Sequence, residues 1–315
     1  MTTRPQAVRP RPHQSASTRW ARWTRSITPY TFVLPVVVFL AALIAFPVFF
    51  NLRISFYDLR AVNLLSGDAP WVGLDNYRAV LANPLFHQAV RNTLLFTAGS
   101  IAFQLSIGLA LALYYHQRFP GASWMRGLYL IAWTVPAVSV AAVFRWLFEG
   151  QVGAINHILN TVGILDTRVL WLTDPSVALG AVTVVNVWLG IPFNMALLLA
   201  ALQGIPAELY EAADIDGANG FAKTRLITVP LLRPAIFAVL LLGLIYTFKV
   251  FDVVWATTQG GPFNATHLVS TLAYRQIFGQ FRFGPGAAML NLLFVVLLFV
   301  AFAYLWNLRH EEGPA

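Results

Sequence analysis

Polar and aromatic side chains interrupt an apolar stretch of the chain between Asn186 and Phe193. The amide of Asn186 can both donate and accept hydrogen bonds, and the ring of Phe193 can stack on the apolar face of a pyranose. Gly190 lies between them and leaves room for a ligand. This chemistry suits the hydroxyl groups and ring faces of a sugar. The alternative is helix packing, in which Gly190 allows close contact and Asn186 bonds to a neighbouring helix.

A second apolar stretch contains Thr247, Lys249 and Asp252. Lys249 and Asp252 are three positions apart, a spacing that places both side chains on one face of a helix. Ionisable groups at membrane depth are costly and mark either a transport pathway or a buried pair. Two interpretations are open: hydrogen bonds to sugar hydroxyls, or a structural ion pair at a helix end. Ser139, in another apolar stretch, is a weaker candidate for the pathway.

The elements that must position these residues are membrane helices. Of the 315 residues 58% are hydrophobic and 11% charged, whereas about a quarter of the residues of a soluble domain are charged. A bilayer core about 30 Å thick requires about 20 apolar residues in a helix. We therefore predict an all-α polytopic membrane protein whose six transmembrane helices cover residues 29–51, 93–115, 125–148, 177–203, 234–256 and 285–307.

The distribution of Lys and Arg predicts the orientation of these helices. The two tails, the 116–124 turn with Arg126 and the 204–233 loop hold twelve basic residues, and the longer opposite segments hold seven. Because basic residues are enriched on the cytoplasmic side, both termini are predicted to be cytoplasmic. The net charge of +8 is then explained by topology and lipid contact, without nucleic acid. The predicted parts are a basic tail (1–28), a first transmembrane helix (29–51), an extracytoplasmic segment (52–92), a core of five transmembrane helices (93–307) and a cytoplasmic tail (308–315).

The cytoplasmic loop 204–233 has the chemistry of a short helix-turn-helix. Pro206 suits the start of a helix, and Gly217 can take the positive φ that ends one. Asn219 suits the N-cap of a second short helix, and Pro230 closes the unit before the next span. The alternative is a compact connection that only satisfies its own backbone.

The same loop reads Glu-Ala-Ala-Asp-Ile-Asp-Gly-Ala from residue 211, then eight residues, then Ile-Thr-Val-Pro. This resembles the EAA loop of ABC importer permeases, EAA-x2-DGA-x8-I-x-L-P, with Val229 where leucine is usual. The resemblance implies a type I importer permease architecture and a loop that fits a cleft on a separate ATPase. The positions implied to couple the two proteins are Glu211, Ala212, Ala213, Asp216, Gly217, Ala218, Ile227 and Pro230.

The Asn186–Phe193 segment resembles the Asn-x-Trp-Leu-Gly-x-Pro-aromatic segment of maltose-type permeases, in which the Asn, Leu, Gly and aromatic positions line the sugar site. Phe193 stands where the maltose relative has tyrosine. Residues 71–93 and the Gly260-Gly261-Pro262 turn are also similar to sugar permeases, so the resemblance covers about residues 30–308. The substrate pathway predicted from both lines of reasoning comprises Asn186, Leu189, Gly190, Phe193, Thr247, Lys249, Asp252 and Ser139.

The resemblance implies a permease subunit of an ATP-driven importer that moves a di- or oligosaccharide across the bacterial cytoplasmic membrane by alternating access. Its implied partners are a second, non-identical permease, two ATPase subunits, an extracytoplasmic sugar-binding protein and membrane lipid. The sequence contains no G-x-x-x-x-G-K-[ST] loop, so ATP and Mg are expected on the ATPase subunits. No cofactor, metal site or enzymatic activity is predicted for this chain.

Two alternative functions are weighed against this interpretation. The same machinery can import glycerol phosphate or its diesters, although a phosphate site needs several convergent Arg or Lys residues. An autonomous secondary transporter would not need the EAA loop, and the sequence shows no internal repeat of the kind such transporters carry.

Overall fold

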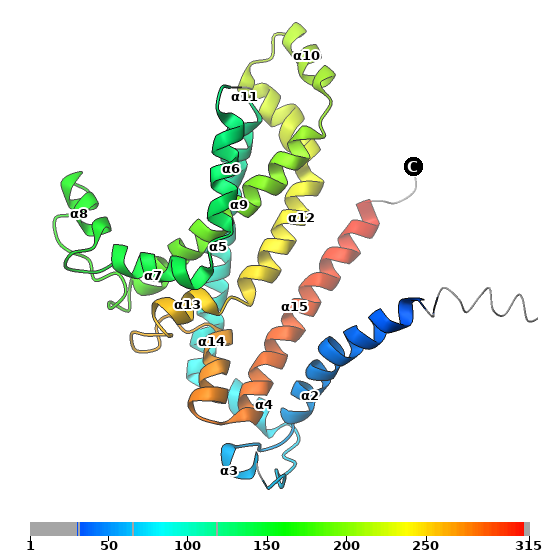
Figure 1. The fold of residues 1–315 in the computed structure, drawn as a ribbon, viewed down its shortest axis with the longest axis vertical. Helices are drawn as coiled ribbons and strands as arrows, with labels where there is room; N and C mark the ends of the chain where they lie inside the picture. The colour runs from blue at the N-terminus through cyan, green and yellow to red at the C-terminus, as the bar shows by residue number, and fades with distance from the viewer. Residues whose placement is uncertain (1–29, 31, 65, 118, 312–315) are drawn as a thin grey trace, which may run out of the picture. The chain divides into compact units, whose positions relative to one another are not determined.

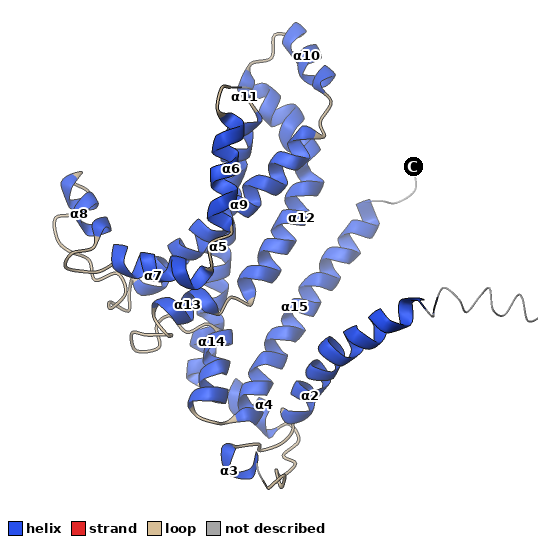
Figure 2. Ribbon diagram, in the orientation of Figure 1, coloured by secondary structure: helices blue, strands red, loops and turns tan. Residues whose placement is uncertain are grey.

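The computed structural model describes residues 30, 32–64, 66–117 and 119–311. These residues form helices and loops and contain no strands (Figure 2). Two isolated antiparallel bridges, Tyr57 with Trp71 and Arg60 with Arg282, occur in loops. The all-α prediction is therefore confirmed. The predicted basic tail (1–28) and residues 312–315 of the predicted C-terminal tail lie outside the described residues.

The chain divides into two units, residues 1–53 and 54–315. From Phe32 on, the described part of the first unit belongs to the helix Phe32–Ile54, which includes the π-helical turn η1 (Ala41–Ala45) and α2 (Phe46–Ile54). The second unit begins at Ile54 and contains the remaining elements (Figure 1). These are α3 (Ala61–Leu64), α4 (Asp75–Leu81), α5 (Pro84–His116), α6 (Ala122–Trp133), α7 (Ala137–Leu147), α8 (Ala154–Thr161), α9 (Ala178–Gln203), α10 (Ala207–Ile215), α11 (Gly220–Lys223), η2 (Thr224–Thr228), α12 (Val229–Phe248), α13 (Asp252–Thr257), α14 (Val269–Tyr274), η3 (Arg275–Gly279) and α15 (Phe283–Glu311).

Five described helices are long and apolar enough to cross a membrane, and the pair α6 and α7 makes a sixth if it counts as one span. This pair is bent by 95°, so the predicted span 125–148 is not one straight helix. The bend falls before Pro136, which lacks a backbone N–H and disfavours helical backbone at Val135.

The predicted span 234–256 is also broken, because α12 ends at Phe248 and α13 begins at Asp252. The backbone between the two helices still finds a partner, since the hydroxyl of Ser270 donates a hydrogen bond to the carbonyl of Val250. Such a contact from a distant residue lets a helix end within an apolar stretch.

The core of the second unit forms where α5 packs along α9, the most extensive helix pair in the described chain. Gly108 of α5 makes this approach possible, because a Cβ atom there would lie 2.7 Å from the Cβ of Asn194. Small residues at such crossings allow close contact between backbones, which is what stabilises helix pairs in lipid. One cluster of buried side chains around this crossing comprises Ala112, Tyr115, Met195, Leu198, Leu199, Leu202, Leu232 and Val239.

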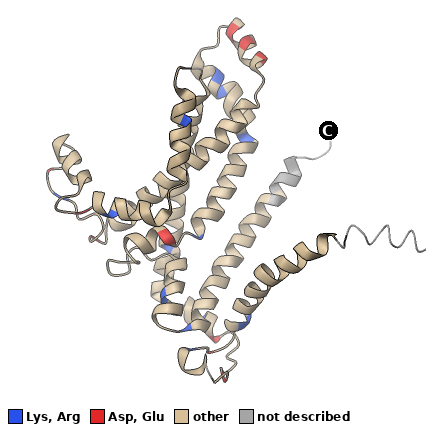
Figure 3. Cartoon of the chain, viewed as in Figure 1, with Lys and Arg blue, Asp and Glu red and all other residues tan. Residues whose placement is uncertain are grey.

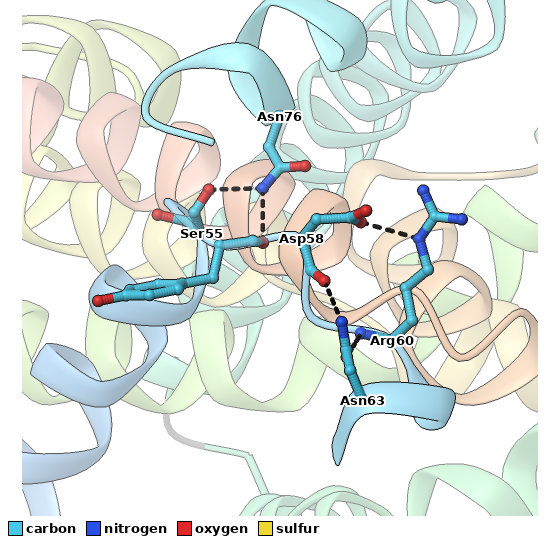
Figure 4. A network of polar contacts seen from close by, with 6 residues as sticks. Ser55, Asp58, Arg60, Asn63 and Asn76 are labelled. Carbon is cyan, nitrogen blue, oxygen red and sulfur yellow. Dashed lines mark hydrogen bonds and ion pairs between the residues drawn. The ribbon is translucent and has the colours of Figure 1, made fainter. Parts of the chain in front are cut away.

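The segment before α4 is held by side-chain bonds to the backbone (Figure 4). The amide of Asn76 is buried and donates to the carbonyls of Ser55 and Tyr57 at 2.8 and 2.9 Å. Asp58 accepts from the guanidinium of Arg60 at 2.8 Å. The two bonds from Asn76 give residues 55–57 a defined conformation, because buried carbonyl groups need a partner.

His267 lies buried in the loop between α13 and α14. Its Nδ1 is 3.1 Å from the hydroxyl of Thr271, and its Nε2 is 3.1 Å from the guanidinium of Arg275. Burial, and secondly the positive charge of Arg275, lower the pKa of His267 from 6.5 to about 4.

We expect this loop to loosen as the pH falls. When the loop is open His267 has its ordinary pKa, so the open state binds more protons between pH 6.5 and about 4. The free energy that keeps the loop closed is therefore at its full value above pH 6.5 and decreases as the pH falls toward about 4. Hydrogen exchange of residues 258–268, corrected for the intrinsic pH dependence, should accelerate over this range. A His267→Gln variant should show a flat profile, and a flat profile in the unmodified protein would contradict the prediction.

Candidate functional site

A cavity of about 530 Å³ opens between α5, α6, α7, α9, α12 and α13. It brings together six predicted pathway residues: Asn186, Leu189, Gly190, Phe193, Thr247 and Asp252. The other two, Lys249 and Ser139, do not line it. The remaining lining residues are Gln104, Trp133, Val135, Ala137, Asn194, Gly243, Tyr246, Val250 and Val253.

One wall of the cavity carries three side-chain amides. Asn186 donates to the hydroxyl of Ser100 at 2.9 Å, and Gln104 donates to the backbone carbonyl of Asn186 at 2.8 Å. Asn194 donates to the carbonyl of Gly190 at 2.8 Å. Asn186 thus makes the helix contact that the packing interpretation expected, and it also lines the cavity.

The amide of Gln104 lies directly against Gly190. A Cβ atom at residue 190 would lie 2.2 Å from Cδ of Gln104, a distance that no pair of carbon atoms tolerates without movement. The missing side chain therefore lets the Gln104 amide lie directly against α9. Gln104 is itself 5% exposed and reaches this place from α5.

Another part of the cavity lining is aromatic. The ring of Phe193 on α9 lies 5.6 Å from that of Trp133 on α6 and 6.1 Å from that of Tyr246 on α12, between centroids. These spacings are typical of stabilising aromatic pairs. Sequence reasoning found only Phe193 of the three. It also missed Gln104, although an amide inside an apolar stretch is the same signal that identified Asn186.

Lys249 and Asp252 do not share a helix face, so that prediction is wrong. Lys249 follows the end of α12 and Asp252 opens α13, because the helix breaks between them. The Nζ of Lys249 lies 5.2 Å above the ring of Tyr246. The carboxylate of Asp252 accepts from the backbone N–H of Val253 at 3.0 Å, and the described residues show no ion pair between it and Lys249. Ser139 is exposed on α7.

The predicted helix-turn-helix forms around Gly217. Its φ is +75°, and its N–H donates to the carbonyl of Asp214 at 3.1 Å. The N–H of Ala218 donates to the carbonyl of Ala213 at 2.9 Å. These two bonds form a Schellman motif, which ends α10 and turns the chain sharply. Asn219 then caps α11 by accepting from Ala222 at 2.8 Å, as the sequence predicted.

The second half of the loop differs from the prediction. Pro230 does not close the unit, because residues Gly220–Phe248 form one continuous helix of 29 residues. The π-helical turn η2 precedes Pro230, and the N–H of Val229 donates to the carbonyl of Thr224. A wider turn at this point relieves the clash that a prolyl ring makes with the preceding carbonyl.

Two side-chain contacts fasten α10 to this long helix. The ammonium of Lys223 lies 2.7 Å from the carboxylate of Asp214, and the hydroxyls of Tyr210 and Thr228 are 2.9 Å apart. Because Tyr246 and Thr247 belong to the same helix and line the cavity, the loop and the cavity are joined by one continuous helix.

The exposed surface of the loop is both acidic and apolar. Figure 3 shows acidic residues gathered on α10, with few charged residues along the long helices. Beside them Ile215, Phe221 and Leu226 are 88%, 75% and 72% exposed. Sequence reasoning passed over these three residues, although large apolar side chains in a polar loop indicate a contact surface. Of the predicted coupling positions, Glu211, Ala212, Asp216 and Gly217 are exposed, and Ala213, Ala218, Ile227 and Pro230 are half-buried.

Comparison with known proteins decides what kind of molecule carries this cavity and this loop. Residues 104–311 match the model of the family described as binding-protein-dependent transport system inner membrane component. The chain belongs to this family. The loop and every lining residue of the cavity fall inside the matched region.

The permease is similar to named transport permeases over most of their length. It is 36% identical to the trehalose/maltose transport system permease protein MalF of Thermococcus litoralis, over 88% of this chain and 92% of that protein. It is 31% identical to the sulfoquinovosyl glycerol transport system permease protein SmoG of Agrobacterium fabrum, over 93% of this chain and 95% of that protein.

A solved structure shows the same fold. A bacterial alginate ABC transporter, in complex with a periplasmic protein that carries an alginate pentasaccharide, contains a chain that matches with a TM-score of 0.79. The match covers 93% of this chain and 98% of that one at 23% identity, so it establishes the type I ABC importer permease fold. The protein is accordingly a multi-pass membrane component of a transport system and not an enzyme.

Proposed function

We propose that this permease is one of the two transmembrane subunits of an ATP-driven ABC importer for a di- or oligosaccharide. The observation that carries the proposal is the composition of the cavity. Its amides Gln104, Asn186 and Asn194 are set to bond hydroxyl groups, and its rings Trp133 and Phe193, with Tyr246, are set to stack on sugar faces.

The size of the cavity agrees with this class of ligand. A volume of about 530 Å³ falls within the range of about 300–1,000 Å³ that small-molecule sites occupy. The described lining contains no Arg, Lys or His, so no observation favours glycerol phosphate, whose phosphate needs convergent cationic donors.

The two functional regions are joined by the helix Gly220–Phe248. At about 1.5 Å per residue its 29 residues span about 43 Å. An ATPase that binds α10 would move this helix through the contacts that Asp214 and Tyr210 make with it. The cavity end of the helix, with Tyr246 and Thr247, would move with it.

The breaks in the helices supply a gate in this proposal. α7 packs against α13, and Ala137 of the first and Val253 of the second both line the cavity. Each short helix follows a break, at 134–136 and at 249–251. Rotation at these breaks would open the cavity to one side while movement of the long helix closes the other, as alternating access requires.

The proposed assembly places this subunit in the bacterial cytoplasmic membrane with both termini in the cytoplasm. Its partners are a second permease, two ATPase subunits that bind ATP and Mg, and an extracytoplasmic sugar-binding protein. The relatives support this assembly, since the family is defined by binding-protein dependence and the alginate transporter was solved with its periplasmic protein.

Purification of the chain from its native membrane in mild detergent tests the assembly. Mass spectrometry should identify an ATPase and a second permease, and the binding protein loaded with its sugar should stimulate ATP hydrolysis by the reconstituted complex. Recovery of the chain alone, under conditions that preserve a known importer of the same type, would contradict the proposal. Stimulation by a phosphodiester and by no sugar would contradict the substrate class.

A further inference from the structure

We infer that Gln104 is a specificity-determining contact that accepts a hydrogen bond from a substrate hydroxyl, in an acceptor wall that disfavours anionic substrates. This inference rests on the proposed function for the identity of the sugar. It goes beyond that function in naming a residue on α5, outside the segments that the sequence singled out for the substrate, and in fixing the direction of the hydrogen bond.

The direction follows from how the amides are held. The NH₂ groups of Gln104, Asn186 and Asn194 each donate to a protein acceptor, at 2.8, 2.9 and 2.8 Å. An amide whose nitrogen is held in this way turns its carbonyl oxygen elsewhere. Within the described part of the chain these three carbonyl oxygens accept no hydrogen bond, and all three residues line the cavity.

The charge of the lining points the same way. Asp252 is the one charged side chain among the described lining residues, and a carboxylate only accepts hydrogen bonds. Lys249 lies over the ring of Tyr246 and does not line the cavity. A hydroxyl can donate to such a wall, whereas a phosphate, sulfonate or carboxylate would meet the partial negative charge of amide oxygens and the negative charge of Asp252.

The position of Gln104 is set by its neighbours. Its amide occupies the space left by Gly190 and bonds to the backbone of Asn186, while Ser100 holds the side chain of Asn186. Ser100 and Gly190 are therefore positioning residues for the acceptor wall. Gln104 is the member that faces the ligand from α5.

The first experiment separates a contact from a structural role. The complete importer in nanodiscs is assayed for ATP hydrolysis with a panel of di- and oligosaccharides that includes maltose and trehalose, and with the monodeoxy derivatives of any sugar that stimulates. For the sugar that stimulates, one deoxy derivative should have an apparent affinity about two- to tenfold lower in the unmodified protein, the usual range for one neutral hydrogen bond. In Gln104→Met this penalty should vanish, whereas Gln88→Met, on the same helix but outside the cavity, should retain it. An unchanged penalty for every derivative in Gln104→Met would overturn the inference.

The second experiment needs no sugar. The chain contains no cysteine, so Gln104→Cys introduces a single thiol whose reaction can be followed by the mass of this subunit. Cationic and anionic methanethiosulfonates of similar size are compared, with Val162→Cys, exposed at the end of α8, as the reference. The cation-to-anion rate ratio at residue 104 should exceed that at residue 162 at least tenfold.

The two experiments distinguish failure of this inference from failure of the proposed function. Equal rate ratios at the two positions would overturn the acceptor wall whatever the substrate is. If no sugar stimulates the unmodified importer, the proposed function fails, while the thiol rates still decide whether the wall rejects anions.

Discussion

Replacement of Gly217 by proline is expected to leave the permease inserted in the membrane and to abolish the stimulation of ATP hydrolysis by the loaded binding protein. The φ of +75° at this residue is closed to proline, whose ring fixes φ near −65°. Proline also removes the N–H that bonds to Asp214. Without the Schellman motif α10 no longer ends in place, so the surface offered to the ATPase changes.

The control for this prediction lies three residues away. Gly220 begins α11 with an ordinary backbone conformation, and a Cβ atom there would meet no other atom within 4 Å. Gly220→Ala should therefore retain stimulation. The measurement is the ATPase rate of reconstituted complexes with and without loaded binding protein, at matched subunit content. Full stimulation in the Gly217→Pro complex would show that the loop geometry does not couple the two proteins.

Replacement of Phe193 by alanine is expected to raise the KM of sugar uptake about ten- to hundredfold, which corresponds to about 1.4–2.7 kcal/mol of lost binding free energy. Phe193 is the central ring of the aromatic group, within 5.6 Å of Trp133 and 6.1 Å of Tyr246. Its loss removes one stacking surface and the support for the two others.

Uptake of a radiolabelled sugar into proteoliposomes measures this effect. Phe193→Tyr keeps the ring and should remain within about threefold of the unmodified protein, since the stacking surface is preserved. Expression and subunit assembly of each variant are checked by affinity purification of the complex. An unchanged KM in Phe193→Ala would remove the aromatic group from the substrate pathway.

The sequence was sufficient for features that depend on neighbouring residues. Long apolar runs predicted membrane helices because each must satisfy its own backbone in lipid. The positive φ at Gly217 and the cap at Asn219 follow from local chemistry, and both occur as predicted. The family membership was also recoverable from the spacing of residues 211–230 and is confirmed by the family match.

Helix continuity was predicted less well, for a physical reason. Pro136 coincides with a 95° bend, whereas Pro230 sits inside a continuous helix because a π-helical turn precedes it. The break after Phe248 has no proline at all and is accompanied by the bond from Ser270 to Val250. Lys249 and Asp252 were consequently placed on one helix face, although α12 ends just before Lys249 and α13 begins at Asp252.

The sequence by itself identified a membrane permease, predicted that its 204–233 loop faces a separate ATPase, and named six residues that line the cavity. Only the tertiary structure decided which residues complete that cavity. Gln104 comes from α5, Trp133 from α6 and Tyr246 from α12, and their meeting around Gly190 and Phe193 depends on how the helices cross. Residue spacing fixes contacts within one helix, whereas contacts between helices are fixed by packing, which no local pattern records.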